Sequence, residues 1–238
     1  MNILADILAA TVLFAVPLLL VALGGMFSER SGIINIALEG IMIIGALFGT
    51  LYLRFADAAG LGASNPQGAM AIAILISAGT GLVYSLLLAF ASVNLKADQT
   101  IGGTALNMLA PAFAITMTWA IQGQGQTNIL IPTWTRITQE TLGIAAKDTF
   151  FQNFLFKSFF LTTPVAIVLF VIAVILLYKT RFGLRLRACG EHPQAADSVG
   201  INVYRMRYAG VMISASHNSF ESVSYTHLRA HETEADLV

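Results

Sequence analysis

Long apolar runs, separated by short polar segments, dominate the chain. About five of these runs are long enough to cross a bilayer, because about 20 helical residues span its hydrocarbon core. They cover residues 3–25, 32–53, 68–93, 101–121 and 157–178, and a sixth apolar segment starts near Tyr208 and stops at Ala215. The pattern predicts an all-α fold, a polytopic transmembrane helix bundle with about five full spans and a truncated sixth.

Composition agrees with an integral membrane protein. The chain has 238 residues, of which 56% are hydrophobic and 11% are charged, whereas soluble domains carry about 25% charged residues. Its formal net charge is zero, so no overall attraction to nucleic acid is expected. The only cysteine, Cys189, excludes an intrachain disulfide and a cysteine-based zinc cluster. We expect a lipid bilayer around the chain, and no metal or cofactor within it.

The distribution of basic residues predicts the topology. Many of them fall between the fifth and sixth apolar runs: Lys179, Arg181, Arg185, Arg187, Arg205 and Arg207. The positive-inside rule places such a segment in the cytoplasm. Counting back along the chain puts the N-terminus and the polar segment 122–156 outside, the latter carrying a helix on the membrane surface.

Glu39 is the one acidic residue well inside an apolar run. If a helix begins near Ser31, Glu39 lies about 12 Å along it at 1.5 Å per residue. Ser31, Asn35 and Glu39 then recur at four-residue spacing and share one helix face. We interpret Asn35 and Glu39 as candidates for the wall of a translocation path. The alternative is that Glu39 binds free backbone groups of a broken neighbouring helix and only holds the bundle together.

A second polar strip lies in the fourth apolar run. Thr100, Thr104, Asn107 and Pro111 recur at three- and four-residue spacing, so they also share a helix face. Thr104 and Asn107 are therefore further candidates for the path. Hydrogen bonding between helices is the competing interpretation.

The basic segment contains a short helix signal. Pro193 suits the first turn of a helix and Gly200 suits its end, which predicts a helix over residues 193–199. Such a helix could project from the membrane and dock on a partner, but physical arguments alone favour an ordinary connector between membrane helices. His192 and Cys189 have no partner at ligand spacing, so neither catalysis nor metal binding is expected of them.

Three segments resemble one family of membrane proteins. Residues 23–40 read LGGMFSERSGIINIALEG, residues 97–107 read ADQTIGGTALN, and residues 190–201 read GEHPQAADSVGI. Together they resemble ABC importer permeases of the ribose, branched-chain amino acid and nucleoside type, nearest the nucleoside and simple-sugar branch.

The resemblance implies a non-enzymatic, multi-pass translocation subunit of the bacterial inner membrane. Its expected partners are a second related permease subunit, a cytoplasmic ABC ATPase that hydrolyses ATP, and an extracellular substrate-binding lipoprotein or periplasmic protein. In such permeases a loop helix docks on the ATPase. The candidate coupling residues are accordingly Glu191, Pro193, Ala195, Ala196, Asp197 and Gly200.

The resemblance ends near Ala215. Residues 216–238 are polar and aperiodic, cannot finish a membrane span, and resemble the spurious ending that translated vector or adapter DNA leaves. We expect an incomplete permease domain over residues 1–215 and a non-native tail over 216–238; an authentic regulatory tail is the alternative.

Two other functions compete with the importer subunit. A stand-alone secondary transporter or facilitator would use Glu39 as its proton-linked group. An intramembrane enzyme is disfavoured because no acid, base, nucleophile and metal ligands converge within the apolar runs.

Overall fold

The computed structural model describes residues 3–123 and 162–235. Its helices in chain order are α1 (Ile3–Arg30), α2 (Leu38–Ala58), α3 (Leu61–Ser64), α4 (Pro66–Ala89), the π-turn η1 (Phe90–Asn94), α5 (Gln99–Gln122), α7 (Thr162–Lys179), α8 (Arg181–Glu191), α9 (Pro193–Ser198) and α10 (Val203–Ala235). No strand occurs within these two ranges. The predicted all-α bundle is confirmed.

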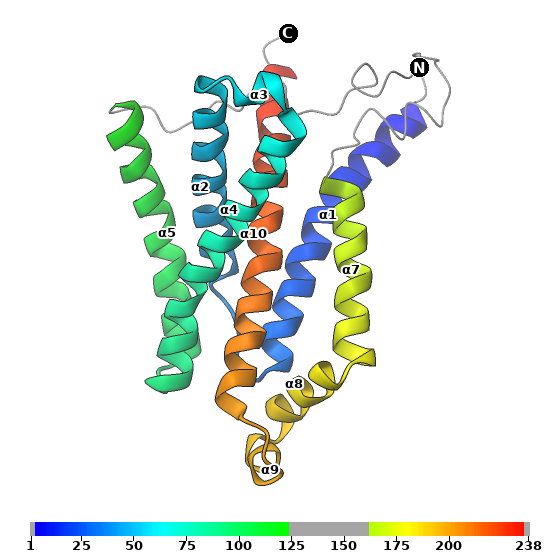
Figure 1. The fold of residues 1–238 in the computed structure, drawn as a ribbon, viewed down its shortest axis with the longest axis vertical. Helices are drawn as coiled ribbons and strands as arrows, with labels where there is room; N and C mark the ends of the chain where they lie inside the picture. The colour runs from blue at the N-terminus through cyan, green and yellow to red at the C-terminus, as the bar shows by residue number, and fades with distance from the viewer. Residues whose placement is uncertain (1–2, 124–161, 236–238) are drawn as a thin grey trace.

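The long helices run side by side along the bundle, with α10 near its centre (Figure 1). Helix α10 packs against α1, α2 and α4. Helix α5 lies at one edge against α2, and α7 lies at the other edge beside α1. Helix α10 joins the two sides of the bundle, and Val211 and Ala215 are its buried hydrophobic residues among those described.

One end of the bundle collects most of the basic residues. Helices α1 and α7, the turn before α5, and α8 and α9 all meet at this end (Figure 1). We call it the basic end, and its cations are Arg30, Lys96, Lys179, Arg181, Arg185, Arg187, Arg205 and Arg207. The positive-inside rule assigns this end to the cytoplasm, and the topology stays a prediction.

Three of the described helices are long and apolar enough to cross a membrane: Leu38–Ala58, Pro66–Asn94 and Gln99–Gln122. The pair α7 and α8, bent by 68° where they meet, would supply a fourth if it formed a single span. The count of about five spans stays a prediction. The expected outer loop and surface helix of residues 122–156 lie almost wholly outside the described residues.

Polar side chains at the helix starts explain where the helices begin. The carboxylate of Asp98 accepts hydrogen bonds from the N–H groups of Thr100 (2.8 Å) and Ile101 (3.1 Å). Asn65 caps α4 through the N–H of Gly68 at 3.1 Å. These caps satisfy backbone donors that the first helical turn leaves free, so α4 and α5 start where their cap residues stand.

The predicted second span begins later than the apolar pattern suggests. Residues 31–37 are not helical, and α2 starts at Leu38 rather than near Ser31. The sequence remains apolar through this stretch, so hydrophobicity alone does not reveal the break. The predicted polar strip of Ser31, Asn35 and Glu39 on one helix face is therefore wrong.

The last helix runs further than expected. The apolar segment was predicted to stop at Ala215, but α10 continues as a helix to Ala235. A helix satisfies its own backbone whatever its side chains are, so polar residues do not force it to end. Asn218 and Ser219 are buried near Gly24 and Gly81, which leave room for them.

Candidate functional site

A tight turn ends α1 at the basic end. Gly32 has φ +85°, its N–H bonds the carbonyl of Glu29 (2.9 Å), and the N–H of Ile33 bonds the carbonyl of Ser28 (3.2 Å). This pair of bonds with a left-handed glycine is a Schellman motif, which stops a helix. The Ser28 hydroxyl also donates to the Ile33 carbonyl at 2.8 Å. The turn explains why the chain leaves the helix despite its apolar sequence.

The segment after this turn lies along one face of α5. We call residues 31–37 the link. The N–H of Ile34 donates to Oε1 of Gln99 (2.8 Å), and Nδ2 of Asn107 donates to the carbonyl of Ile36 (2.8 Å). A Cβ atom on Gly103 would lie only 2.9 Å from Cβ of Ile36. Side chains four residues apart share a helix face, so one face of α5 holds the whole link.

Helix α2 starts inside the bundle, as Figure 1 shows. The N–H of Gly40, in its first turn, donates to Oδ1 of Asn107 at 2.7 Å. Asn107 stands eight residues beyond Gln99, about 12 Å along α5 at 1.5 Å per residue. The first turn of α2 therefore lies about 12 Å from the level of Gln99, towards the middle of the bundle.

The amide of Asn35 is used within the fold. Its side chain is 8% exposed; Oδ1 accepts from the N–H of Ala37 (3.1 Å), and Nδ2 donates to the hydroxyl of Ser214 in α10 (3.3 Å). Ser31 is buried too, and its hydroxyl donates to the carbonyl of Ser28 at 2.6 Å. Both residues shape the link, and a role of Asn35 in a path stays a prediction.

Glu39 lies at the surface, in the first turn of α2. A helix N-terminus carries a partial positive charge, which stabilises a carboxylate placed there. Asn107 meets Gly40, the next residue along, so Asn107 and the base of Glu39 are brought together. Within the described residues, Asn107 makes the bonds to backbone groups beside the break, and the alternative that Glu39 binds such groups of a neighbouring helix stays a prediction.

Thr104 lies on the exposed surface of α5. Its hydroxyl donates to the carbonyls of Thr100 (2.9 Å) and Ile101 (3.0 Å) within the same helix. The residues of the predicted strip on α5 therefore differ in their surroundings: Asn107 bonds to the link and to α2, and Thr104 is exposed. Gln99 and Gly103, which the spacing did not indicate, lie with Asn107 on the face that contacts the link.

The short helix predicted in the basic segment is present. Helix α9 covers Pro193–Ser198, and Gly200 follows with φ +83° and its N–H bonded to the carbonyl of Asp197 at 2.9 Å. His192 belongs to both neighbouring helices. Its N–H bonds the carbonyl of Ala188, and its carbonyl accepts from the N–H of Ala196, both at 3.0 Å. Helices α8 and α9 thus form one elbow.

Most of the elbow tip faces outward at the basic end (Figure 1). Glu191, Ala195, Asp197 and Gly200 are exposed and Pro193 is partly exposed, but Ala196 is only 4% exposed. Ala196 therefore anchors α9 and does not belong to its outer face. An apolar side chain that the sequence reasoning missed, Val199, is 74% exposed. The available signal was a valine directly after the polar residues Asp197 and Ser198.

Cys189 is fully buried in α8. Burial raises the pKa of its thiol, and the nearby Arg207 guanidinium opposes that rise. A protonated, buried thiol is a poor nucleophile. Within residues 3–123 and 162–235, no three His, Cys, Asp or Glu side chains come close enough to hold a metal ion.

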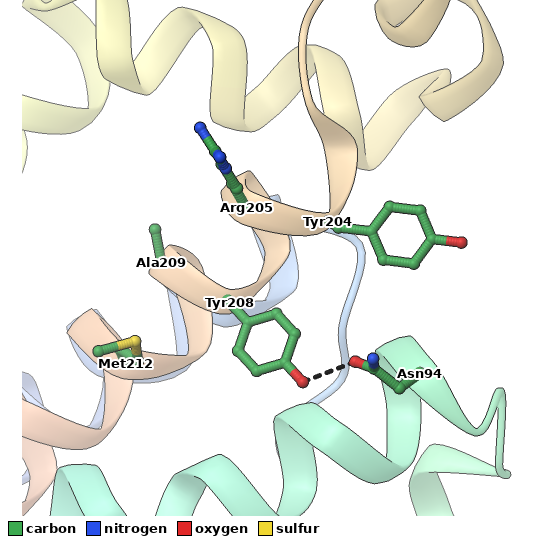
Figure 2. A pocket seen from close by; sticks show the side chains of 6 residues that line it. All are labelled: Asn94, Tyr204, Arg205, Tyr208, Ala209 and Met212. Carbon is green, nitrogen blue, oxygen red and sulfur yellow. Dashed lines mark hydrogen bonds between the residues drawn. The ribbon is translucent and has the colours of Figure 1, made fainter.

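A shallow cavity of about 400 Å³ lies between α10 and the π-turn. It is lined by Asn94, Tyr204, Arg205, Tyr208, Ala209 and Met212. The hydroxyl of Tyr208 donates to Oδ1 of Asn94 at 2.6 Å. Figure 2 shows the Arg205 side chain pointing away from this pair. The lining groups do not converge on one point, so we assign the Tyr208–Asn94 bond to packing of α10 on the π-turn.

Comparison with known families decides between these interpretations. Residues 7–217 match the family described as branched-chain amino acid transport system / permease component. The match covers most of the chain, including the link, α5, the elbow and the first half of α10. The chain belongs to this permease family.

Two curated relatives of this permease chain cover 90% of its residues. It is 44% identical over 214 residues to the guanosine ABC transporter permease protein NupQ of Bacillus subtilis. It is 42% identical over 215 residues to the nucleoside ABC transporter permease protein NupC of Lactococcus lactis. In both cases the permease chain spans 64% of the relative's length. No solved structure matches it.

Proposed function

We propose that this chain is the translocation subunit of an ATP-driven importer in the bacterial inner membrane. It performs no catalysis, and a separate cytoplasmic ABC ATPase supplies the energy. A second related permease and an extracellular binding lipoprotein or periplasmic protein complete the complex. The substrate is a small polar solute, which we take to be a nucleoside. A simple sugar is the alternative substrate.

The elbow at the basic end carries this proposal. Helix α9 projects at the end that the positive-inside rule assigns to the cytoplasm. The outer face of the elbow combines Glu191, the last residue of α8, with Asp197 of α9 and the exposed Val199 that follows it. A mixed acidic and apolar knob on a rigid helix suits docking in a groove of a partner protein. Membership of the permease family and the names of NupQ and NupC support the same assignment.

The start of α2 supports a path beside it. Its first turn lies inside the bundle, next to Asn107, with the Glu39 carboxylate at the surface. An ionisable group at membrane depth is costly unless it faces water or a partner. We assign Glu39 and Thr104 to the water-facing side of the path, and Asn35 and Asn107 to its support.

Uptake of radiolabelled nucleoside by cells carrying the complete operon tests the proposal. One variant replaces Pro193–Ser198 with six glycine and serine residues. The matched control replaces α3, Leu61–Ser64 at the opposite end, with four. We expect uptake in the α9 variant to fall to that of cells lacking the ATPase gene, while the α3 variant keeps most of its uptake.

The other outcomes separate the competing functions. Undiminished uptake in the α9 variant contradicts the coupling role of the elbow. Uptake that survives deletion of the ATPase gene and depends on Glu39 indicates a secondary transporter. Excess unlabelled nucleoside should block uptake of labelled nucleoside, and excess ribose should not. If the same cells instead import labelled ribose and no labelled nucleoside, the path belongs to a simple sugar.

A further inference from the structure

Gly190 of the elbow lies against the turn that ends α1. A Cβ atom on Gly190 would lie 2.4 Å from the carbonyl oxygen of Arg30 and 3.1 Å from the backbone nitrogen of Gly32. Real Cβ atoms do not approach backbone that closely, so only glycine fits. Gly190 stands three residues before Pro193, the first residue of α9. The turn that ends α1 therefore lies against α8, and α8 leads into the docking helix α9 two residues later.

The turn is held from its other side as well. A Cβ atom on Gly210 of α10 would lie 2.5 Å from Cβ of Ser31, and a Cβ atom on Gly32 would lie 3.4 Å from Nη2 of Arg207. The turn is thus wedged between α8 and α10. We call this contact of Gly190 and Gly210 with the turn the junction. Close packing transmits displacement because it leaves no free space to absorb it.

Beyond the junction the link is anchored again at short intervals. Gln99 holds Ile34, and Asn107 holds both Ile36 and Gly40. The elbow on the other side is stiff because His192 is bonded into both of its helices. A continuous set of backbone contacts therefore runs from α9 through the junction and the link to the first turn of α2.

We propose that the junction is where motion of the docking helix enters the membrane part of the permease. The link carries this motion to the N-terminus of α2 and shifts it along α5, changing the exposure of the path beside Glu39. Gly190, Gly32 and Gln99 are positioning residues in this scheme, since none of them touches substrate. The inference rests on the proposed function as an ATP-driven importer.

The test measures ATP hydrolysis and nucleoside import in the same proteoliposomes, using the complete transporter. Gly190→Ala forces the elbow and the link apart. We expect hydrolysis to continue while import per ATP falls about tenfold, within the usual range of coupling between sites. The matched control is Gly79→Ala in α4, because a Cβ atom there meets nothing within 4 Å. This control should keep the ratio of the wild-type transporter.

A second variant keeps the proposal testable if Gly190→Ala does not assemble. Gln99→Ala removes the bond to Ile34 from a partly exposed side chain, so the link loses its hold on α5. Import per ATP should fall here too. Its control is Thr116→Ala on the same helix, where the hydroxyl bonds only the carbonyl of Ala112 at 2.8 Å. Because both variants act on one path, their effects together should be less than additive.

Two results would overturn the proposal. The first is that import per ATP stays at the wild-type value in an assembled Gly190→Ala or Gln99→Ala transporter; hydrolysis and import that fall in proportion give this result and indicate a structural role alone. Additive effects in the double variant would also place the two residues on separate paths. If the wild-type complex itself shows no ATP-dependent import, the proposed function fails instead.

Discussion

Asn107 and Gly40 are joined by a 2.7 Å hydrogen bond, from the N–H of Gly40 to Oδ1 of the amide. The same amide donates to the carbonyl of Ile36 at 2.8 Å. One side chain thus satisfies a donor and an acceptor that the break before α2 leaves free. Backbone N–H and carbonyl groups inside the bilayer cannot form hydrogen bonds to water. Asn107 therefore lowers the free-energy cost of the break before α2.

Replacing Asn107 should therefore destabilise the chain strongly. Asn107→Ala leaves two partly buried backbone groups unpaired, at up to about 1–3 kcal/mol each. Asn107→Asp keeps the acceptor for the N–H of Gly40 but loses the donor to the carbonyl of Ile36. Its unfolding free energy should therefore lie between those of the wild-type chain and Asn107→Ala. Unfolding in mixed detergent micelles measures the loss. Thr116→Ala should change little, and a stable Asn107→Ala would show that the bridge is dispensable.

The Asp98 side chain, which caps α5, should contribute less to the unfolding free energy than Asn107 does. Asp98 accepts two backbone N–H bonds at an exposed helix start, and loss of such a cap costs about 1 kcal/mol. We expect Asp98→Ala to lower the unfolding free energy by about that amount, while Asp98→Asn and Asp98→Ser retain most of it. Equal losses in all three variants would mean that the carboxylate acts through another contact.

The lone thiol offers a test of the elbow. Cys189 is buried and burial raises its pKa, so less thiolate is present at neutral pH than in an exposed cysteine. We expect slow maleimide labelling at pH 7 that accelerates as the pH rises through the raised pKa. Chain denatured in dodecyl sulfate serves as the control and should label fast. Rapid labelling of the folded chain would show that α8 does not shield this residue.

Asn218 presents the opposite situation to Asn107. It is fully buried in α10, and neither atom of its amide has a partner within the described part of the chain. An apolar group of similar shape removes that penalty, so Asn218→Leu should raise the melting temperature. This fits our hypothesis that residues 216–238 are foreign to the permease fold. Destabilisation by Asn218→Leu would indicate that the amide is used.

Apolar periodicity and turn residues were enough to predict the bundle, the approximate positions of α4 and α5, and the helix α9. Pro193 and Gly200 have local backbone effects, so their meaning does not depend on the rest of the fold. The basic residues gather at one end of the bundle (Figure 1), and each acts through its own charge; the topology that they predict is untested.

The break before α2 could not be predicted in this way. Gly32 ends α1 only because Gly190 and Gly210 leave room for its turn, and these residues are far away in the sequence. The sequence shows that Asn107 is a polar residue within an apolar run. It does not show that its hydrogen-bond partners are backbone atoms of Ile36 and Gly40, because residue spacing within one helix carries no information about other segments. Contacts between distant segments, rather than local pattern, determine this part of the site.

Val199 provides the sharpest separation of folding from docking. Its side chain is 74% exposed beside α9, so Val199→Asp removes no packing within the chain and should leave its stability within about 0.5 kcal/mol. If α9 docks on the ATPase, a charge there should weaken co-purification of the two subunits and lower import, and Val199→Ile should not. Ala196→Asp is the contrasting variant, because Ala196 is buried and an unpaired charge at that position should destabilise the fold itself. Full co-purification and import in the Val199→Asp variant would exclude this face of the elbow from the interface.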